Sequence, residues 1–322
     1  MGFSDIITAT GTDPLIPTEQ STEIIKSTRE ASLALTLGRR LPNLARGSRT
    51  LKVEDTMASV YMVDGPSGTT APGLKQTTDT SWRDVVLTAE ELAVVVVIGQ
   101  NQLDDAMVPI WPEVKEQIAA KMAKAIDEAV TVGTVGGVAV WSSWPTGGIR
   151  THAVNAGNTV AFPTGVDLYA DLLGASGIFS LIEADGFEVN GVVGAISMQA
   201  QLRDCRDGIG NPIFHKDPSS GKLADLYGAP CYFPKNAAMS ATTGLILGDW
   251  SQLVYSVRQD LTYTIATEGV ISDAAGNIVV NLFQQDAVAI RAVMRLGIAL
   301  PNPVNMTQET TASRSPFGVV TI

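Results

Sequence analysis

Apolar residues recur every three or four positions between residues 111 and 129, and this is the strongest periodic pattern in the chain. The apolar positions of this stripe are Trp111, Val114, Ile118, Met122, Ala125 and Ala129. Charged residues lie mostly off the stripe, as in a helix that packs one face on a core. Pro112 suits the first turn of such a helix and Gly133 suits its end. The pattern therefore predicts a long helix over residues 110–132 that packs on a sheet.

Two segments with strand character, 51–63 and 81–98, flank a stretch at 64–80 that is rich in Gly, Pro and Thr. This order predicts a long β-hairpin. Its arms mix charged residues with Val, Met and Tyr, so neither face is apolar enough to form a core of its own. Because an isolated two-stranded hairpin is only marginally stable in water, we expect this one to lie on a partner, with another subunit as the obvious choice.

Helical patterns precede and follow the hairpin. Residues 18–40 predict a helix with Thr18 or Ser21 as its N-cap and with Gly38 as its stop. Residues 166–184 predict a second helix, in which the sequence GASG indicates a kink.

Strand patterns dominate the second half of the chain. A strand at 188–196 and a helix at 198–205 complete an α/β unit with its own core. The segments 244–269 and 277–301 predict further strands, and we expect the last of them to return and pack against the long helix.

Composition indicates a folded protein with an acidic surface. The chain has 322 residues, is 45% hydrophobic and 17% charged, and carries a formal net charge of −11. This charge disfavours a dedicated nucleic-acid binder, because such proteins bind largely by neutralising phosphates. The two cysteines, Cys205 and Cys231, do not make a disulfide framework. No apolar run approaches the roughly 20 residues of a membrane span, so we expect no membrane partner.

A basic segment interrupts this acidic chain. No acid occurs between Ala31 and Val53, whereas five cations accumulate there: Arg39, Arg40, Arg46, Arg49 and Lys52. The segment could touch nucleic acid without reading its sequence. It could equally dock on the acidic surface of a neighbouring copy, which the global charge favours.

Residues suited to catalysis or metal binding are scarce. The two histidines, His152 and His215, lie in unrelated contexts without ligands at metal-binding spacing, so we interpret both as structural or solvated. Asp104 and Asp105 follow the apolar run that ends at Gly99, and we interpret them as caps at the start of a helix rather than as a catalytic pair. No phosphate-binding loop, dinucleotide motif or nucleophile motif is present. We therefore expect neither a cofactor nor an enzymatic activity.

The order of these elements, with a few sequence blocks, resembles a known family. The blocks are SWRDVVLTAEELAVVVVIGQNQLDDA, IWPEVKEQIAAKMAKAIDEAVTVG, LGDWSQLVYSVRQDLTY and NLFQQDAVAIRAVMRLGIAL. Nearly the whole chain resembles a major capsid protein of a tailed bacteriophage, with the fold named for phage Hong Kong 97. The resemblance implies an α+β fold with an N-terminal arm, an extended β-hairpin called the E-loop, a peripheral domain with a long spine helix, and an α/β axial domain.

Carried over by segment, the resemblance implies the following division of the chain. The expected parts are an N-arm at 1–48, an E-loop at 49–92, a peripheral domain at 93–160 and 251–300 with its spine helix at 110–132, and an axial domain at 161–250 and 301–322. Loops near 206–222 and 236–244 would gather at local five-fold and six-fold axes.

The implied function is self-assembly into an icosahedral shell that encloses phage double-stranded DNA, built in the host cytoplasm and found in the virion. The implied partners are further copies in pentamers and hexamers, a portal, a separate scaffolding protein, a possible decoration protein and DNA contacted without specificity. Candidate intersubunit contacts are Arg39, Arg40, Arg46, Arg49, Lys52, Asp64, Lys75 and Asp79. An encapsulin-type nanocompartment shell is the alternative, and a cofactor-free enzyme is a remote one.

Overall fold

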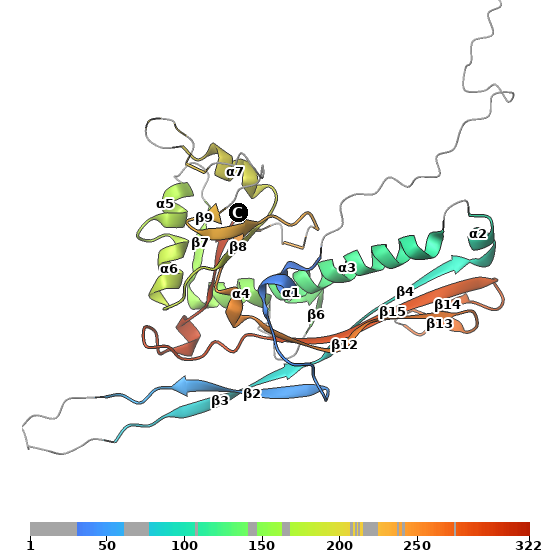
Figure 1. Cartoon of the computed structure of the whole chain (residues 1–322), viewed down its shortest axis with the longest axis horizontal. Helices are drawn as coiled ribbons and strands as arrows, with labels where there is room; N and C mark the ends of the chain where they lie inside the picture. The colour runs from blue at the N-terminus through green and yellow to red at the C-terminus, as the bar shows by residue number, and fades with distance from the viewer. Residues whose placement is uncertain are drawn as a thin grey trace, which may run out of the picture.

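The computed structural model of the chain places two sheets around one long helix and extends a hairpin away from them (Figure 1). The residues that it describes are 31–60, 77–106, 109–140, 147–162, 168–206, 209, 211, 213–214, 225–236, 238–239, 242–273 and 275–322.

The first sheet has four strands in the order β1-β12-β15-β4. Its strands are β1 (Arg39–Arg40), β12 (Val254–Ala266), β15 (Ala287–Ala299) and β4 (Glu90–Gly99). β1 pairs in parallel with β12, whereas the other neighbours are antiparallel. A small hairpin, β13 (Val270–Ser272) with β14 (Ile278–Asn281), joins β12 to β15 at one end of the molecule.

The helix α3 (Ile110–Val132) lies across this sheet, which confirms the predicted long helix and its bounds. Its buried residues Ile118 and Met122 pack on Ile290 and Ala292 of β15, so the predicted return of the last long strand to the helix is also confirmed. The helix ends at Gly133, whose φ of 79° is left-handed. An added Cβ there would meet the backbone nitrogen of Gly148 at 2.4 Å, so a residue without a side chain is required.

The second sheet has six strands in the order β7-β16-β11-β8-β10-β9. They are β7 (Thr159–Ala161), β16 (Phe317–Thr321), β11 (Thr243–Gly248), β8 (Gly191–Gly194), β10 (Ala229–Tyr232) and β9 (Asp225–Leu226). The helices packed around it are α4 (Gly148–Ala156), α5 (Leu168–Leu173), α6 (Ile178–Ala184) and α7 (Met198–Asp204). A separate apolar core lies between α5 to α7 and this sheet, as expected for the α/β unit.

The projecting hairpin consists of β2 (Ser48–Thr56) and β3 (Ser81–Thr88), paired antiparallel. The prediction of one continuous second arm over 81–98 is wrong, because the chain breaks at Ala89. There the backbone N–H of Ala89 donates to the oxygen of Gly47, and β4 then leaves the hairpin to pair with β15. The chain passes so close to Gly297 of β15 that a Cβ there would meet the oxygen of Thr88 at 2.7 Å.

The predicted helix over 18–40 is confirmed only in part among the described residues. The helix α1 (Leu33–Leu37) begins after Ser32, whose backbone is extended and whose side-chain hydroxyl forms the N-cap by accepting from the N–H of Leu35. Gly38 ends α1, as predicted. The caps predicted at Thr18 and Ser21 lie outside the described residues.

The predicted second helix is interrupted at its GASG sequence. The chain forms α5 and α6 instead, and an added Cβ at Gly174 would meet the oxygen of Ala170 at 2.4 Å. The kink is therefore a complete break. The strand predicted at 188–196 is shortened to β8.

Short elements complete the described chain. They are α2 (Gln100–Asp104), β5 (Thr134–Val135), β6 (Val138–Ala139) and the 3-10 turns η1 (Trp250–Gln252) and η2 (Thr311–Ser313).

Candidate functional site

The inner face of the hairpin base is an apolar surface that packs on the body of its own chain. Leu87 of β3 is fully buried, and it belongs to one core cluster with Leu44, Val254 and Ala299. Leu51 and Val85 pack against the same cluster. Alternate residues of a strand face opposite sides, so the other set of side chains in β2 and β3 faces outward.

Arg83 fixes the hairpin to the segment that follows β15. Its guanidinium donates to the oxygens of Pro301 and Asn302, at 2.5 and 2.9 Å, and lies 3.2 Å from Asp55 of the facing strand. The N–H of Val304 also donates to the oxygen of Glu54 at 3.1 Å. These contacts hold the hairpin base at one angle to the body, so β2 and β3 leave the body in a defined direction.

The outer face of the hairpin is exposed and carries a large apolar side chain. Trp82 is 64% exposed and Val86 is 39% exposed. Lys52 and Asp84, which face each other across the strands, form an exposed ion pair of 2.5 Å between them. An exposed tryptophan beside a charged pair is typical of an interface rather than of a free surface. Trp82 is not among the contact candidates predicted from the sequence, although its outward position in the strand alternation could have indicated it.

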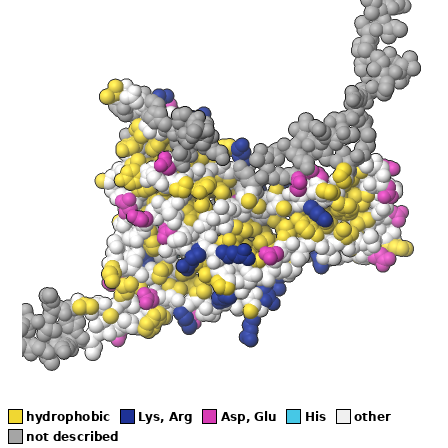
Figure 2. All heavy atoms as spheres, in the orientation of Figure 1, with side chains coloured by type: hydrophobic (Ala, Val, Ile, Leu, Met, Phe, Trp, Pro, Cys, Tyr) yellow, Lys and Arg dark blue, Asp and Glu magenta, His cyan; other side chains and the backbone are white. Residues whose placement is uncertain are grey.

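The predicted basic segment is spread over a turn and two strands. Arg39 and Arg40 lie exposed on β1. Arg49 donates to the oxygens of Pro42 and Asn43, at 3.0 and 3.1 Å, so its guanidinium braces the turn before β2. Arg46 is exposed. Figure 2 shows Lys and Arg side chains gathered on one part of the visible face, where the chain leads into the hairpin.

Of the remaining contact candidates, the structure describes Asp79. Asp79 is exposed in the segment that leads into β3. Asp64 and Lys75 lie outside the described residues, as does His215.

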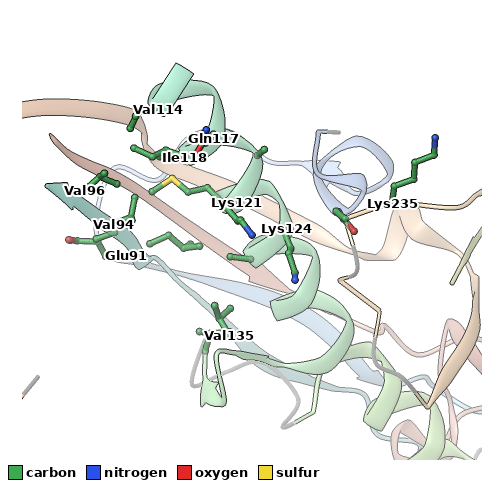
Figure 3. A pocket seen from close by; sticks show the side chains of 17 residues that line it. Glu91, Val94, Val96, Val114, Gln117, Ile118, Lys121, Lys124, Val135 and Lys235 are labelled. Atoms are coloured by element: carbon green, nitrogen blue, oxygen red, sulfur yellow. The ribbon is translucent and has the colours of Figure 1, made fainter. Parts of the chain in front are cut away.

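An open groove of about 790 Å³ runs between α3 and β4 (Figure 3). Its apolar floor includes Val94 and Val96 of β4 and Ile118 of α3, while Lys121 and Lys124 lie along the helix side. In the described part of the chain β4 is the last strand of its sheet and has no strand partner beyond β15. An unpaired strand edge beside an apolar groove is a ready site for another chain.

The carboxylate pair, interpreted above as caps at a helix start, lies elsewhere. Asp104 ends the short helix α2, and Asp105 is its C-cap. The amide of Gln100 donates to Asp104 at 3.3 Å, and both carboxylates are exposed. The capping interpretation is therefore wrong, because the chain turns once after Gly99 before the long helix begins. Asp104 lines a hollow of about 380 Å³, but no second titratable side chain is among the described residues that line it, so the pair lacks the setting of a reaction centre.

His152 is held in a polar cluster beneath the hairpin base. Its Nδ1 lies 3.0 Å from the hydroxyl of Ser315. Burial lowers the pKa of His152 to about 4, and the cations Arg83 and Arg314 act in the same direction. The neutral ring is thus the native form, which suits a structural histidine.

This low pKa predicts an acid-sensitive fold. The unfolded chain binds a proton at His152 below pH 6.5, whereas the folded chain does so only below about 4. The contribution of His152 therefore lowers the free energy of unfolding as the pH drops from 6.5 toward 4, by about 3 kcal/mol in total. Urea unfolding of the unassembled protein between pH 7 and 4 measures this loss.

The His152→Gln variant is expected to lose most of that pH dependence, since its amide keeps a partner for Ser315 and binds no proton in this range. The matched control is His215→Gln, which should retain the full dependence. An unchanged slope in His152→Gln would show that another group titrates.

Thiol chemistry is also disfavoured. Burial raises the pKa of the Cys231 thiol to about 12, with the Asp225 carboxylate acting in the same direction. No group of three or more His, Cys, Asp or Glu in the described residues is placed to hold a metal ion. No described helix is long and apolar enough to cross a membrane.

Asp127 is a buried carboxylate that joins three parts of the chain, and the sequence analysis missed it. It lies on α3 and accepts from the hydroxyl of Ser32 at 2.6 Å, from the N–H of Ala34 at 3.0 Å and from the amide of Asn236 at 2.8 Å. Burial raises its pKa above the usual range, and these donors oppose that effect. The carboxylate thus pins the start of α1 to the long helix.

A family model and several known proteins match this chain. The model described as the phage capsid family matches residues 12–305. A curated relative, the major capsid protein of Staphylococcus phage 80alpha, is 23% identical over 289 residues, which cover 89% of this chain and 82% of the relative.

Solved structures agree with the family match. A chain from Microbacterium phage Oxtober96 has a TM-score of 0.79 at 28% identity and covers 95% of this chain and 96% of its own. A chain from Mycobacterium phage Adephagia has a TM-score of 0.80 at 25% identity, with 98% of each chain covered. These findings favour neither an encapsulin-type compartment nor an enzyme. Because the family model spans most of the sequence, the chain belongs to the phage capsid family.

Proposed function

We propose that this protein is the major capsid protein of a tailed phage and that its copies build the icosahedral head shell around the double-stranded DNA. The family match over residues 12–305 carries the proposal. The protein is then a structural component of the virion, and no chemical reaction belongs to its role.

The hairpin supplies a mechanism for joining copies. It projects from the body with Trp82 exposed on its outer face, while Arg83 fixes its base. A surface of one copy that binds a different surface of the next generates rings when the rotation closes, and five-membered and six-membered rings suit an icosahedral shell. Permanent assemblies typically bury more than about 2,000 Å² per interface, so the hairpin would share this task with the N-terminal arm.

The segments would keep the roles that the resemblance implies. Residues 1–48 form the arm and residues 49–92 form the E-loop, which lies on a neighbour. α3 with the four-stranded sheet forms the peripheral domain. The six-stranded sheet forms the axial domain, and because it includes β7, we place the division just before Thr159.

The basic segment would either face the DNA inside the shell or help the arm dock on a neighbouring copy. Arg39, Arg40 and Arg46 are exposed, whereas Arg49 is occupied in bracing its own turn. Packaged DNA is confined rather than recognised, so a modest positive charge suffices. A portal, a scaffolding protein and a decoration protein would complete the particle.

Electron microscopy with negative stain tests the proposal. The protein, expressed alone and with a candidate scaffolding protein from its own genome, should form closed shells of uniform diameter. Particles purified from infected cells should contain DNA and this chain as the main protein. A chain that stays monomeric under all these conditions, or particles that hold an enzyme cargo instead of DNA, would contradict it.

A further inference from the structure

The groove between α3 and β4 is apolar at its floor and positive along one side. Figure 3 shows Lys121 and Lys124 extending from α3, whereas Lys235 lies apart from them with its side chain pointing away. Glu91 is the one acidic residue among those that line the groove, and it projects from the strand side. Within the described residues, neither Lys121 nor Lys124 forms an ion pair. The residues that line the groove therefore carry a net positive charge beside an unpaired strand edge.

The unpaired strand edge, the apolar floor and the positive side of the groove favour binding of an extended chain with apolar and acidic residues. A strand added to the free edge of β4 would satisfy its outward backbone groups and cover the floor. The groove follows α3 from Val114 to Ala125, about 17 Å of helix, which about five residues of extended chain would span.

The protein's own sequence contains one segment of this chemistry. Residues 1–20 include three acids, Asp5, Asp13 and Glu19, no Lys or Arg, and several aliphatic residues. The free end of the hairpin fits the groove less well, because its residues 61–76 contain one acid and one base, which cancel.

The path of the arm indicates which copy supplies this segment. The described chain begins at Ala31, which lines a separate apolar hollow with Ala119, Ala123 and Leu261 on the β12 side of α3. An arm that starts there would have to cross its own long helix to enter the groove on the β4 side. The arm of a second copy starts from another molecule and is not held to that side of this helix.

We propose that the groove between α3 and β4 binds residues 1–20 of a second copy of this chain, with the arm's carboxylates against Lys121 and Lys124. The inference rests on the proposed shell, since it names a contact between neighbours. It places the arm along the β4 edge.

Carbodiimide crosslinking of assembled shells tests the contact, because this reagent joins a carboxylate to a lysine amine without a spacer. Mass spectrometry should find Asp5, Asp13 or Glu19 joined to Lys121 or Lys124, and a denaturing gel should show chains linked into dimers and larger ladders. Links confined to single chains would overturn the second-copy assignment. Links from Asp64 in place of the arm would assign the groove to the hairpin.

Charge variants sharpen the test. The double variant Lys121→Glu with Lys124→Glu should raise the rate at which protease cleaves the arm more than about tenfold, since like charges would then face each other. Protease cleavage is the readout here because the variant lacks the two amines that the crosslinker needs. Adding Asp5→Lys and Asp13→Lys should restore binding of the arm, measured as protection of the arm from protease.

The matched control is Lys115→Glu, on the same helix but outside the groove, where the ammonium lies over the ring of Tyr263. This variant should leave the arm links unchanged. Wild-type shells that form normally without arm–groove links would overturn this inference and leave the proposed function intact. A wild-type chain that builds no shell would instead overturn the proposed function.

Discussion

Deleting residues 64–78 is expected to abolish shell formation while the rest of the chain stays folded. The strand β2 ends at Thr56 and β3 begins at Ser81, so the deletion leaves their pairing intact. It also leaves Arg83 on its carbonyl partners. Among the described contacts, the deletion removes the 3.0 Å hydrogen bond from the N–H of Ser59 to Thr78. The lost segment is the part that would reach a neighbour.

The measurement combines electron microscopy for shells with sizing and circular dichroism for the fold. We expect monomers or small rings with a wild-type spectrum and an unfolding midpoint close to that of the wild type. A companion variant, Trp82→Ser, changes an exposed side chain and should weaken assembly without unfolding the protein. Normal particles from the deletion variant would show that the hairpin does not join the copies.

Local pattern was sufficient for the long helix. The apolar stripe over residues 111–129, with Pro112 near one end and Gly133 at the other, determines both its bounds and the face that packs on β15. The strand β15, within the segment predicted at 277–301, and its packing on that helix followed from the same reasoning, although the segment also holds the separate strand β14.

Elements set by contacts distant in sequence could not be predicted in the same way. Residues 81–98 have one continuous strand pattern, yet the chain changes sheets at Ala89. There the N–H of Ala89 donates to the oxygen of Gly47, and Gly297, which has no side chain, lets the backbone pass close to β15. Likewise, nothing in the sequence around Ser32 distinguishes it from a serine inside a helix, so its role as an N-cap could not be predicted. Its role as a cap depends on Asp127, which lies 95 positions away and accepts from its hydroxyl.

The candidate site was predictable in its location but less so in its residues. The mixed polarity of the hairpin indicated a need for a partner. The basic segment, in contrast, gave no sign that the guanidinium of Arg49 donates to a backbone oxygen of the turn before β2. Arg314 lies in a polar stretch of the tail that predicts exposure, but it is fully buried. Burial of a charge depends on acceptors gathered from the folded chain, which a linear pattern does not show.

Replacing Arg314 by Met is expected to lower the free energy of unfolding by about 3–5 kcal/mol. The guanidinium donates to the backbone oxygens of Gln308 and Asn302, at 2.6 and 2.9 Å, and to the side-chain oxygen of Asn302 at 3.2 Å. Methionine fills a similar volume but leaves these acceptors without donors. The backbone oxygen of Asn302 also accepts a hydrogen bond from Arg83, so the angle between the hairpin and the body should become less defined. Urea unfolding of the unassembled variant measures the loss.

Two further variants separate charge from geometry. Arg46→Met removes an exposed arginine and should change the free energy of unfolding by less than about 0.5 kcal/mol. Arg314→Lys keeps the charge, but a single ammonium cannot reproduce the planar set of donors. Its decrease in the free energy of unfolding should therefore lie between those of Arg46→Met and Arg314→Met. Equal stability of Arg314→Met and the wild type would mean that the segment at 301–309 holds its conformation without this side chain. The base of the hairpin would then depend on Arg83 and on the apolar contacts of Leu87.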